Sequence, residues 1–162
     1  MAYWTLTNLK RNRFSYNENS MKIDRILFNK IRYELLPQNG SISFIRENNF
    51  AGFSFDIDRI NDLRNIEHEG RMPDFEFLNP KLEKIKEELI THIANFSKLI
   101  SHNTYLTHNG LQTIPPEWEH EQPVKFRKIV NEIHNETSLI CNKYDELIKT
   151  GRRVFAEQQV KA

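Results

Sequence analysis

The chain has 162 residues, a net charge of +1 and one cysteine. This length fits one domain with a hydrophobic core, and the lone cysteine excludes an intrachain disulfide. The near-neutral charge argues against a bulk nucleic-acid binder. Since no apolar run approaches the ~20 residues of a membrane helix, and no secretory signal is recognisable, we expect a cytoplasmic protein without a membrane span. We expect a single domain over residues 1–162, with 1–19 as a packed or partly mobile arm.

Charge is distributed unevenly along the chain. Residues 1–36 carry seven Lys and Arg against three acidic residues, residues 149–162 carry four against one, and the middle carries twelve against eighteen. If the two basic ends lie together, they would form a basic patch for a phosphate-bearing partner. Attraction between the basic ends and the acidic middle explains the same distribution, and we favour this second explanation.

The first helix is predicted from Ser20, which can act as its N-cap, to the region of Pro37 and the Asn39-Gly40 pair. Its apolar residues recur at steps of three and four, which is typical of an amphipathic helix. These residues are Ile23, Ile26, Leu27, Ile31 and Leu35.

Residues 41–78 allow two interpretations. The first has a short helix after Ser41 and a second helix from Asp56, with apolar residues at steps of three: Ile57, Ile60, Leu63 and Ile66. The second has a small Phe-rich sheet, with Phe53, Phe55 and Ile57 alternating on one strand and Phe75 and Phe77 on another. Periodicity does not separate short helices from short strands, so a small sheet stays as the alternative to the helices we prefer.

A long helix is predicted over about 80–103. Asn79 is a suitable N-cap and Pro80 fits the first helical position. The residues that follow form a continuous apolar stripe: Leu82, Ile85, Leu89, Ile93, Phe96, Leu99 and Ile100. His92 falls on this stripe, so we expect a buried imidazole with a hydrogen-bond partner.

A second long helix is predicted over about 117–155, beginning at Pro116 or bending at Pro123. Its stripe consists of Phe126, Ile129, Val130, Ile133, Ile140, Tyr144, Leu147, Ile148, Val154 and Phe155. Two long helices with facing stripes and a connection of about a dozen residues form an antiparallel hairpin. We therefore predict an all-α helical bundle built on this hairpin, with shorter N-terminal helices beside it; the alternative is an α+β fold with the small sheet in 41–78.

The stretch TIPPEWEHEQPVKF, residues 113–126, gathers acidic residues and a histidine. Glu117 and His120 have the Glu-x-x-His spacing that bundle-core metal sites use, but the sequence has no second copy, so we expect no metal and no cofactor. The prolines and acidic residues suit the beginning of a helix, where negative charge meets the positive end of the helix dipole. Trp118, with Glu117 and His120 beside it, is our candidate for binding a partner.

The stretch RKIVNEIH, residues 127–134, contains an Arg and a His separated by six residues on one helix face. It resembles the Arg and His motif of the HEPN nucleases, all-α proteins that cleave RNA, usually as dimers. The resemblance covers eight residues. It implies that His134 would act as general acid and base on the 2′-hydroxyl and that Arg127 would stabilise the phosphate.

The sequence contains no phosphate-binding Gly-rich loop, no His-Glu-x-x-His and no zinc-binding Cys/His spacing. We therefore predict a helical interaction or accessory module that binds another macromolecule, either a protein partner or a second copy of itself. The alternative is a HEPN-like, metal-independent ribonuclease that acts as a dimer on RNA.

Overall fold

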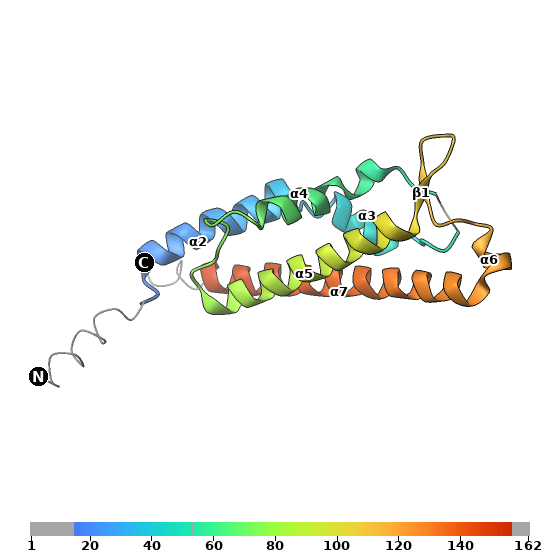
Figure 1. Ribbon diagram of the computed structural model, residues 1–162. Coiled ribbons are helices and arrows are strands. Elements are labelled where there is room, and N and C mark those ends of the chain that lie inside the picture. Colours follow the sequence, from blue (N-terminus) through green and yellow to red (C-terminus); the bar gives the residue numbers. More distant parts are fainter. Residues whose placement is uncertain (1–14, 53, 157–162) are drawn as a thin grey trace, which may run out of the picture.

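A computed structural model describes residues 15–52 and 54–156 and confirms the predicted all-α class (Figure 1). Residues 1–14 of the predicted arm lie outside the described residues. The last two residues of the arm, Glu18 and Asn19, belong to the first described helix. In chain order the elements are α2 (Glu18–Lys30), η1 (Ile31–Leu35), α3 (Ser41–Glu47), η2 (Ile57–Ile60), α4 (Asn61–Glu69), α5 (Pro80–Asn103), β1 (Tyr105–Leu106), β2 (Gln112–Thr113), α6 (Trp118–Glu121) and α7 (Pro123–Ala156).

The long antiparallel hairpin is formed by α5 and α7, which lie side by side along most of the molecule (Figure 1). The predicted N-cap of α5 is confirmed: the side chain of Asn79 accepts hydrogen bonds from the backbone N–H groups of Lys81 and Leu82 at 3.0 and 3.2 Å. The facing stripes of both helices are buried, as expected from their spacing.

The second predicted helix is divided in two at Gln122. This residue has φ −138° and ψ 62°, which is not helical, so the short α6 ends there and α7 begins at Pro123. Proline has no backbone N–H and is tolerated at the first turn of a helix. The α7 helix then runs without interruption to Ala156.

The first helix begins earlier than predicted and buries a different face. Its N-cap is Asn17, whose side chain accepts from the N–H of Ser20 at 3.0 Å, and Ser20 itself is buried inside the helix. Ile23 and Ile26 are 54% and 72% exposed, while Asp24 is fully buried. The apolar period therefore identified the helix and the burial of Leu27 and Ile31 correctly, but it placed Ile23 and Ile26 on the buried face wrongly.

The helices predicted within 41–78 are confirmed as α3, η2 and α4, and the Phe-rich sheet is not formed among the described residues there. Phe75 and Phe77 are buried in an extended segment whose backbone is satisfied by side chains of α2 and α5. The N–H of Phe77 donates to Glu83 at 2.6 Å, and buried Lys86 donates to the carbonyl of Phe75. These side chains satisfy the backbone groups that a neighbouring strand would pair with in a sheet.

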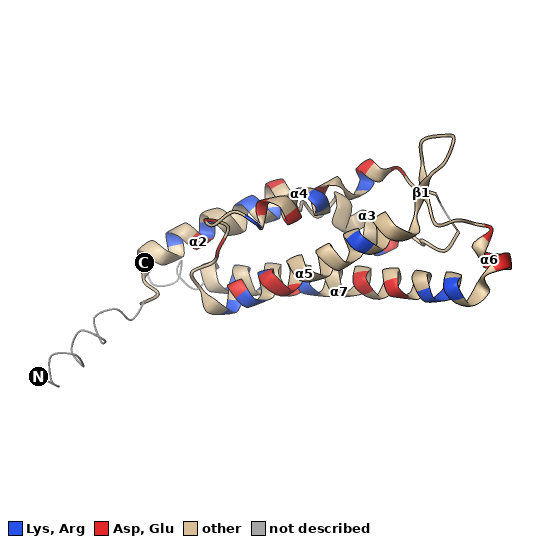
Figure 2. Cartoon of the chain, in the orientation of Figure 1, with Lys and Arg blue, Asp and Glu red and all other residues tan. Residues whose placement is uncertain are grey.

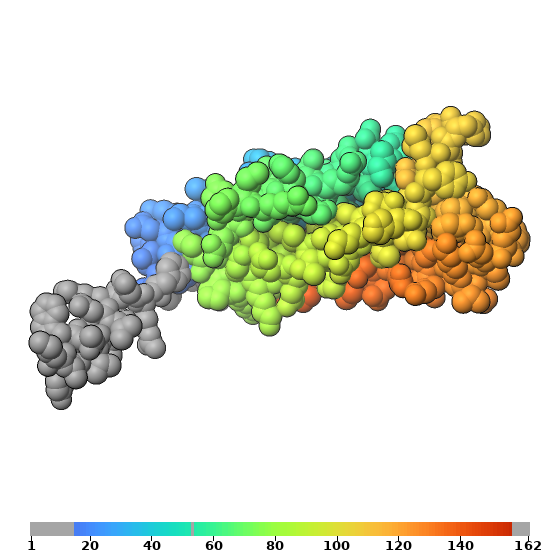
Figure 3. Space-filling view, in the orientation of Figure 1, coloured from blue at the N-terminus to red at the C-terminus, as the bar shows by residue number. Residues whose placement is uncertain are grey.

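A small β-hairpin follows α5, in a segment where no strand was predicted. Its strands pair Tyr105 with Thr113 and Leu106 with Gln112, and Phe55 extends the pairing through a bridge to Gln112. Gly110 lies in the turn with φ 77°, a left-handed conformation that favours glycine. The hairpin projects at the end of the body that also holds α6 (gold and orange in Figure 3).

At the opposite end of the molecule, the first and the last described helices come together. There α2 lies against the last turns of α7, and the rings of Phe28 and Phe155 are 5.2 Å apart. Among the described helices, none is both long and apolar enough to cross a membrane.

Candidate functional site

A groove of about 520 Å³ lies between η1 and the C-terminal part of α7. This volume is within the range of about 300–1,000 Å³ that is usual for ligand sites in proteins. We name it the basic groove. Its lining residues are Arg32, Tyr33, Pro37, Gln38, Asn39, Tyr144, Asp145, Ile148, Lys149 and Arg152.

The first wall of the basic groove is a turn of π-helix. The N–H of Leu36 donates to the carbonyl of Ile31, five residues earlier, at 2.8 Å, and both side chains are fully buried. The hydroxyl of Tyr144 in α7 donates to the carbonyl of Leu36 at 2.9 Å. Single π-turns are rare and frequent at functional sites, and this one directs Arg32 and Tyr33 to the groove while its apolar residues stay in the core.

The second wall is the end of α7, which approaches α2 closely at Gly151. A Cβ on Gly151 would overlap the ring of Phe28, so the absence of a side chain allows this ring to lie directly on the α7 backbone. The guanidinium of Arg25 donates to the carbonyl of Phe155 at 3.4 Å and lies 5.7 Å from the centroid of its ring. These contacts hold the end of α7 beside α2.

The acidic residue on the groove wall is neutralised. Arg46 of α3 forms a two-pronged hydrogen bond to Asp145, with N–O distances of 2.9 and 3.2 Å. This contact raises the pKa of Arg46 above its ordinary value. Asp145 therefore contributes little negative charge to the groove.

Three cations line the basic groove without an anionic partner. Arg32, Lys149 and Arg152 form no ion pair with any residue in 15–52 or 54–156. Beside them, Tyr33 is 63% exposed, and the Cζ of Arg32 lies 5.0 Å from the centroid of its ring. The groove thus combines uncompensated positive charge, an exposed aromatic ring and the side-chain amides of Gln38 and Asn39.

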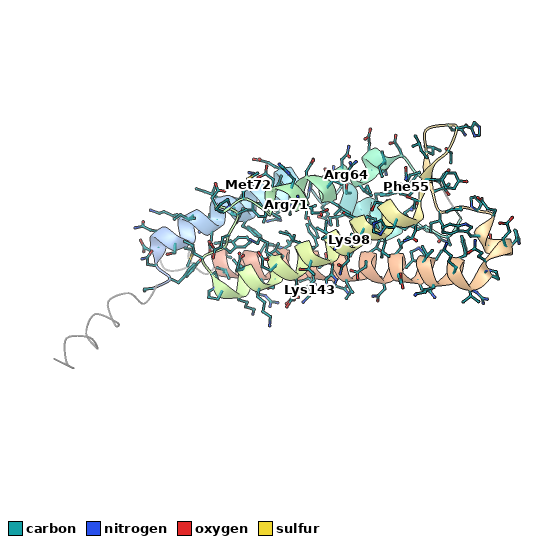
Figure 4. The ribbon with its side chains drawn as sticks, in the orientation of Figure 1. Phe55, Arg64, Arg71, Met72, Lys98 and Lys143 are labelled. Carbon is teal, nitrogen blue, oxygen red and sulfur yellow. The ribbon has the colours of Figure 1, made fainter. Side chains whose placement is uncertain are left out.

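A second depression, between α4 and α5, is also lined by three cations. They are Arg64 of α4, Arg71 just beyond its end and Lys98 of α5, all labelled in Figure 4. Arg71 is paired with Glu67 at 3.7 Å, so part of its charge is compensated. On the face drawn in Figure 2, both acidic and basic residues lie along α5 and α7.

The predicted partner-binding residues Trp118, Glu117 and His120 lie around α6, at the end of the molecule away from the basic groove (Figures 1 and 2). Glu117 and His120 are exposed, whereas Trp118 is half-buried and packs against the core. The ammonium of Lys125 lies 3.8 Å from the centroid of the Trp118 ring. The tryptophan therefore anchors the turn between α6 and α7.

Within the described part of the chain, no group of three or more His, Cys, Asp or Glu side chains is placed to hold a metal ion. His92 has the hydrogen-bond partner that its place on the α5 stripe predicts: its Nδ1 lies 2.8 Å from Oε2 of Glu136 in α7. The imidazole is partly buried and not fully enclosed.

Arg127 and His134 share a face of α7, as predicted, but the structure gives them separate partners. The Nε of Arg127 donates to the carbonyl of Pro123 at 3.3 Å. The Nε2 of His134 accepts a hydrogen bond from the N–H of Phe50 at 3.1 Å, and burial lowers the pKa of this imidazole. His134 thus satisfies the backbone between α3 and η2 as a neutral side chain.

No family model, curated protein or solved structure matches this chain. The residues of the basic groove were not selected from the sequence. A partial signal was the excess of Lys and Arg near the C-terminus, since Lys149 and Arg152 belong to it; most of the N-terminal excess lies in residues 1–14, outside the described residues. The exposed Tyr33 carried no sequence signal, because its exposure depends on the π-turn.

Proposed function

We propose that this chain is an interaction module that binds another macromolecule, and that the basic groove holds anionic groups of this partner. The observation that carries the proposal is the convergence of Arg32, Lys149 and Arg152 on one groove without acidic partners in the described chain. Cations concentrated in a cleft attract anions strongly, because the protein walls exclude part of the screening solvent.

The chemistry of the groove fits phosphate groups. The guanidinium of an arginine presents two parallel N–H donors that match two phosphate oxygens, and a lysine supplies a compact positive charge. Arg32 from η1 and Arg152 from α7 approach from opposite walls, so a bound phosphate group would bridge two elements. Binding of phosphate groups by these cations requires no catalytic residue.

The ribonuclease alternative has no comparable support. A general acid and base must exchange a proton at an accessible nitrogen. The Nε2 of His134 is occupied by the N–H of Phe50, and Arg127 is bonded to its own helix. These contacts support a structural role for His134.

The proposal can be tested with an anionic polymer that has no bases and no apolar groups. Binding of fluorescently labelled inorganic polyphosphate would be measured by anisotropy for the wild type and for the Lys149→Gln/Arg152→Gln variant. Since a hydrogen bond to a charged group is worth about 1.5–3 kcal/mol, we expect the dissociation constant of the variant to rise at least about tenfold.

The matched control is Arg127→Gln/Lys128→Gln, which removes two exposed cations from the other end of the same helix. It changes the net charge by the same amount as the groove variant does. Because it leaves the groove intact, it should bind polyphosphate nearly as the wild type does. Equal binding by the groove variant and the control variant would contradict the proposal. Thermal unfolding of both variants verifies that the loss of binding is not a loss of fold.

A further inference from the structure

We infer that the partner held in the basic groove is a single-stranded nucleic acid, with one base stacked on Tyr33 and the phosphates bound by Arg32, Lys149 and Arg152. The inference rests on the proposed function and names the chemical class of its partner. Its first step is the placement of an exposed aromatic ring beside uncompensated cations, because this pairing binds the two parts of a nucleotide.

Tyr33 provides the surface for the base. Its ring is 63% exposed on the groove wall, although the sequence places it within a helix that is otherwise packed on the core. The guanidinium of Arg32 lies against this ring with 5.0 Å between Cζ and the ring centroid. A base that stacks on the other face of the tyrosine would place the ring between itself and a delocalised cation, an arrangement that adds a cation–π contribution to the stack.

The opposite wall provides the phosphate contacts. Lys149 and Arg152 are three residues apart on α7, so their Cβ atoms are neighbours at about 5–6 Å and both side chains face the same groove. The exposed amides of Gln38 and Asn39, between the two walls, have both donors and acceptors for the edge of an unpaired base.

The groove favours a single strand over a duplex or an acidic protein. In a duplex the bases are stacked on one another, so their faces cannot reach a tyrosine ring. Protein interfaces usually have an apolar centre surrounded by a polar rim. The basic groove lacks such an apolar centre: Tyr33 is its exposed aromatic residue, and the other exposed lining residues are Gln38, Asn39, Lys149 and Arg152.

The experiment compares four labelled probes at one salt concentration: oligouridylate, oligothymidylate, inorganic polyphosphate and polyglutamate. For the wild type we expect tighter binding of the two oligonucleotides than of polyglutamate. Tyr33→Ala should weaken oligonucleotide binding about tenfold and leave polyphosphate binding unchanged, since polyphosphate has nothing to stack. Tyr33→Phe should bind like the wild type, because stacking does not need the hydroxyl.

Tyr105→Ala is the matched control. It removes another exposed tyrosine, on β1 at the other end of the molecule, and should leave the binding of all four probes unchanged. The comparison of oligouridylate with oligothymidylate decides whether the natural partner is RNA or DNA, since a preference for the former indicates contacts to the 2′-hydroxyl.

The outcomes separate the inference from the proposed function. If Tyr33→Ala leaves oligonucleotide binding unchanged while Lys149→Gln/Arg152→Gln weakens polyphosphate binding, the groove binds anions but the nucleic-acid inference is wrong. Tighter binding of polyglutamate than of the oligonucleotides would also overturn the inference and indicate an acidic protein. If the wild type binds none of the probes, both statements fail.

Discussion

Asp24 connects α2 to the beginning of α5. Its carboxylate is fully buried and accepts three hydrogen bonds, from the hydroxyl of Tyr16 at 2.8 Å and from the N–H groups of Leu78 and Asn79 at 2.7 and 2.8 Å. Burial is the largest cause that raises the pKa of Tyr16, and the hydrogen bond to Asp24 is the second. A buried carboxylate with all these donors satisfied is a fixed part of the core and not a reactive group.

Replacement of Asp24 by alanine should destabilise the protein strongly. The change leaves the N–H groups of Leu78 and Asn79 buried without acceptors, and each such loss costs about 1–3 kcal/mol. We expect the free energy of unfolding in urea to fall by about 3 kcal/mol. Asp74→Ala, at an exposed position, should change it little. Similar losses in both variants would show that the hydrogen bonds of Asp24 do not contribute measurably to the free energy of unfolding.

His134 should make stability depend on pH. Burial lowers its pKa in the folded protein below the value of about 6.5 in the unfolded chain. As the pH falls below about 6.5, the unfolded state binds a proton that the folded state does not, so the stability from neutral His134 is lost progressively toward the folded-state pKa. We expect this loss in urea titrations between pH 8 and pH 5.

The His134→Gln variant tests this assignment, because a glutamine oxygen can accept the bond from Phe50 without titrating. Its stability should vary less with pH than that of the wild type. His102→Gln removes an exposed histidine and should keep the wild-type profile. A His134→Gln profile parallel to that of the wild type would exclude His134 as the titrating group.

At the scale of the elements, the contact between α2 and α7 depends on one residue without a side chain. Gly151 interrupts the apolar stripe of α7, and the ring of Phe28 fills the space that its Cβ would occupy. Close packing leaves little freedom for such a ring to move. The same contact holds one side of the basic groove in place.

Gly151→Ala should therefore destabilise the protein, although alanine is the better helix former by about 1 kcal/mol. Overpacking of a filled core costs about 1–3 kcal/mol, so we expect a net loss of about 1–2 kcal/mol in urea unfolding. The double variant Phe28→Ala/Gly151→Ala should lose less than the sum of the single variants, because the truncated side chain no longer overlaps the added methyl group. Gly52→Ala, with open space around its Cβ position, is the control.

At the scale of the whole molecule, charge is distributed unevenly. The α6 turn at one end carries Glu119 and Glu121, and the basic groove lies away from that end, between η1 and the C-terminal part of α7. Attraction between the basic ends and the acidic middle accounts for part of this arrangement, for example Lys30 with Glu69 at 3.2 Å. Arg32, Lys149 and Arg152 are left without such partners in the described chain.

Binding of an oligonucleotide should therefore depend on salt in a defined way. Each phosphate contact to a single strand contributes about −0.7 to the slope of log K against log salt concentration, so three contacts predict a slope of about −2. Arg152→Gln should make the slope less steep by about 0.7. Anisotropy titrations from about 50 to 200 mM salt measure both values. A slope near zero would exclude binding through phosphates.

Much of the fold was predictable because the signals are local. The Asn79 cap, the Pro80 start and the stripe of α5 all lie within one segment, and each acts whatever the rest of the chain does. The prolines of residues 113–126 likewise mark the beginning of α6 and α7 correctly. The ring of Trp118 contacts Lys125 and the core, and its role in binding a partner stays a prediction.

The sequence by itself thus determined the helical class, the long hairpin and the ends of α5, because hydrophobic periodicity and capping act over a few neighbouring residues. Only the tertiary structure decided which face of α2 is buried and why Phe75 and Phe77 form no strand. It also decided that Arg32 and Arg152, from two different elements, line one groove. These features depend on contacts between residues that are far apart in the chain. Whether a side chain is buried depends on which other segment packs against it. The sequence of one segment does not identify that other segment.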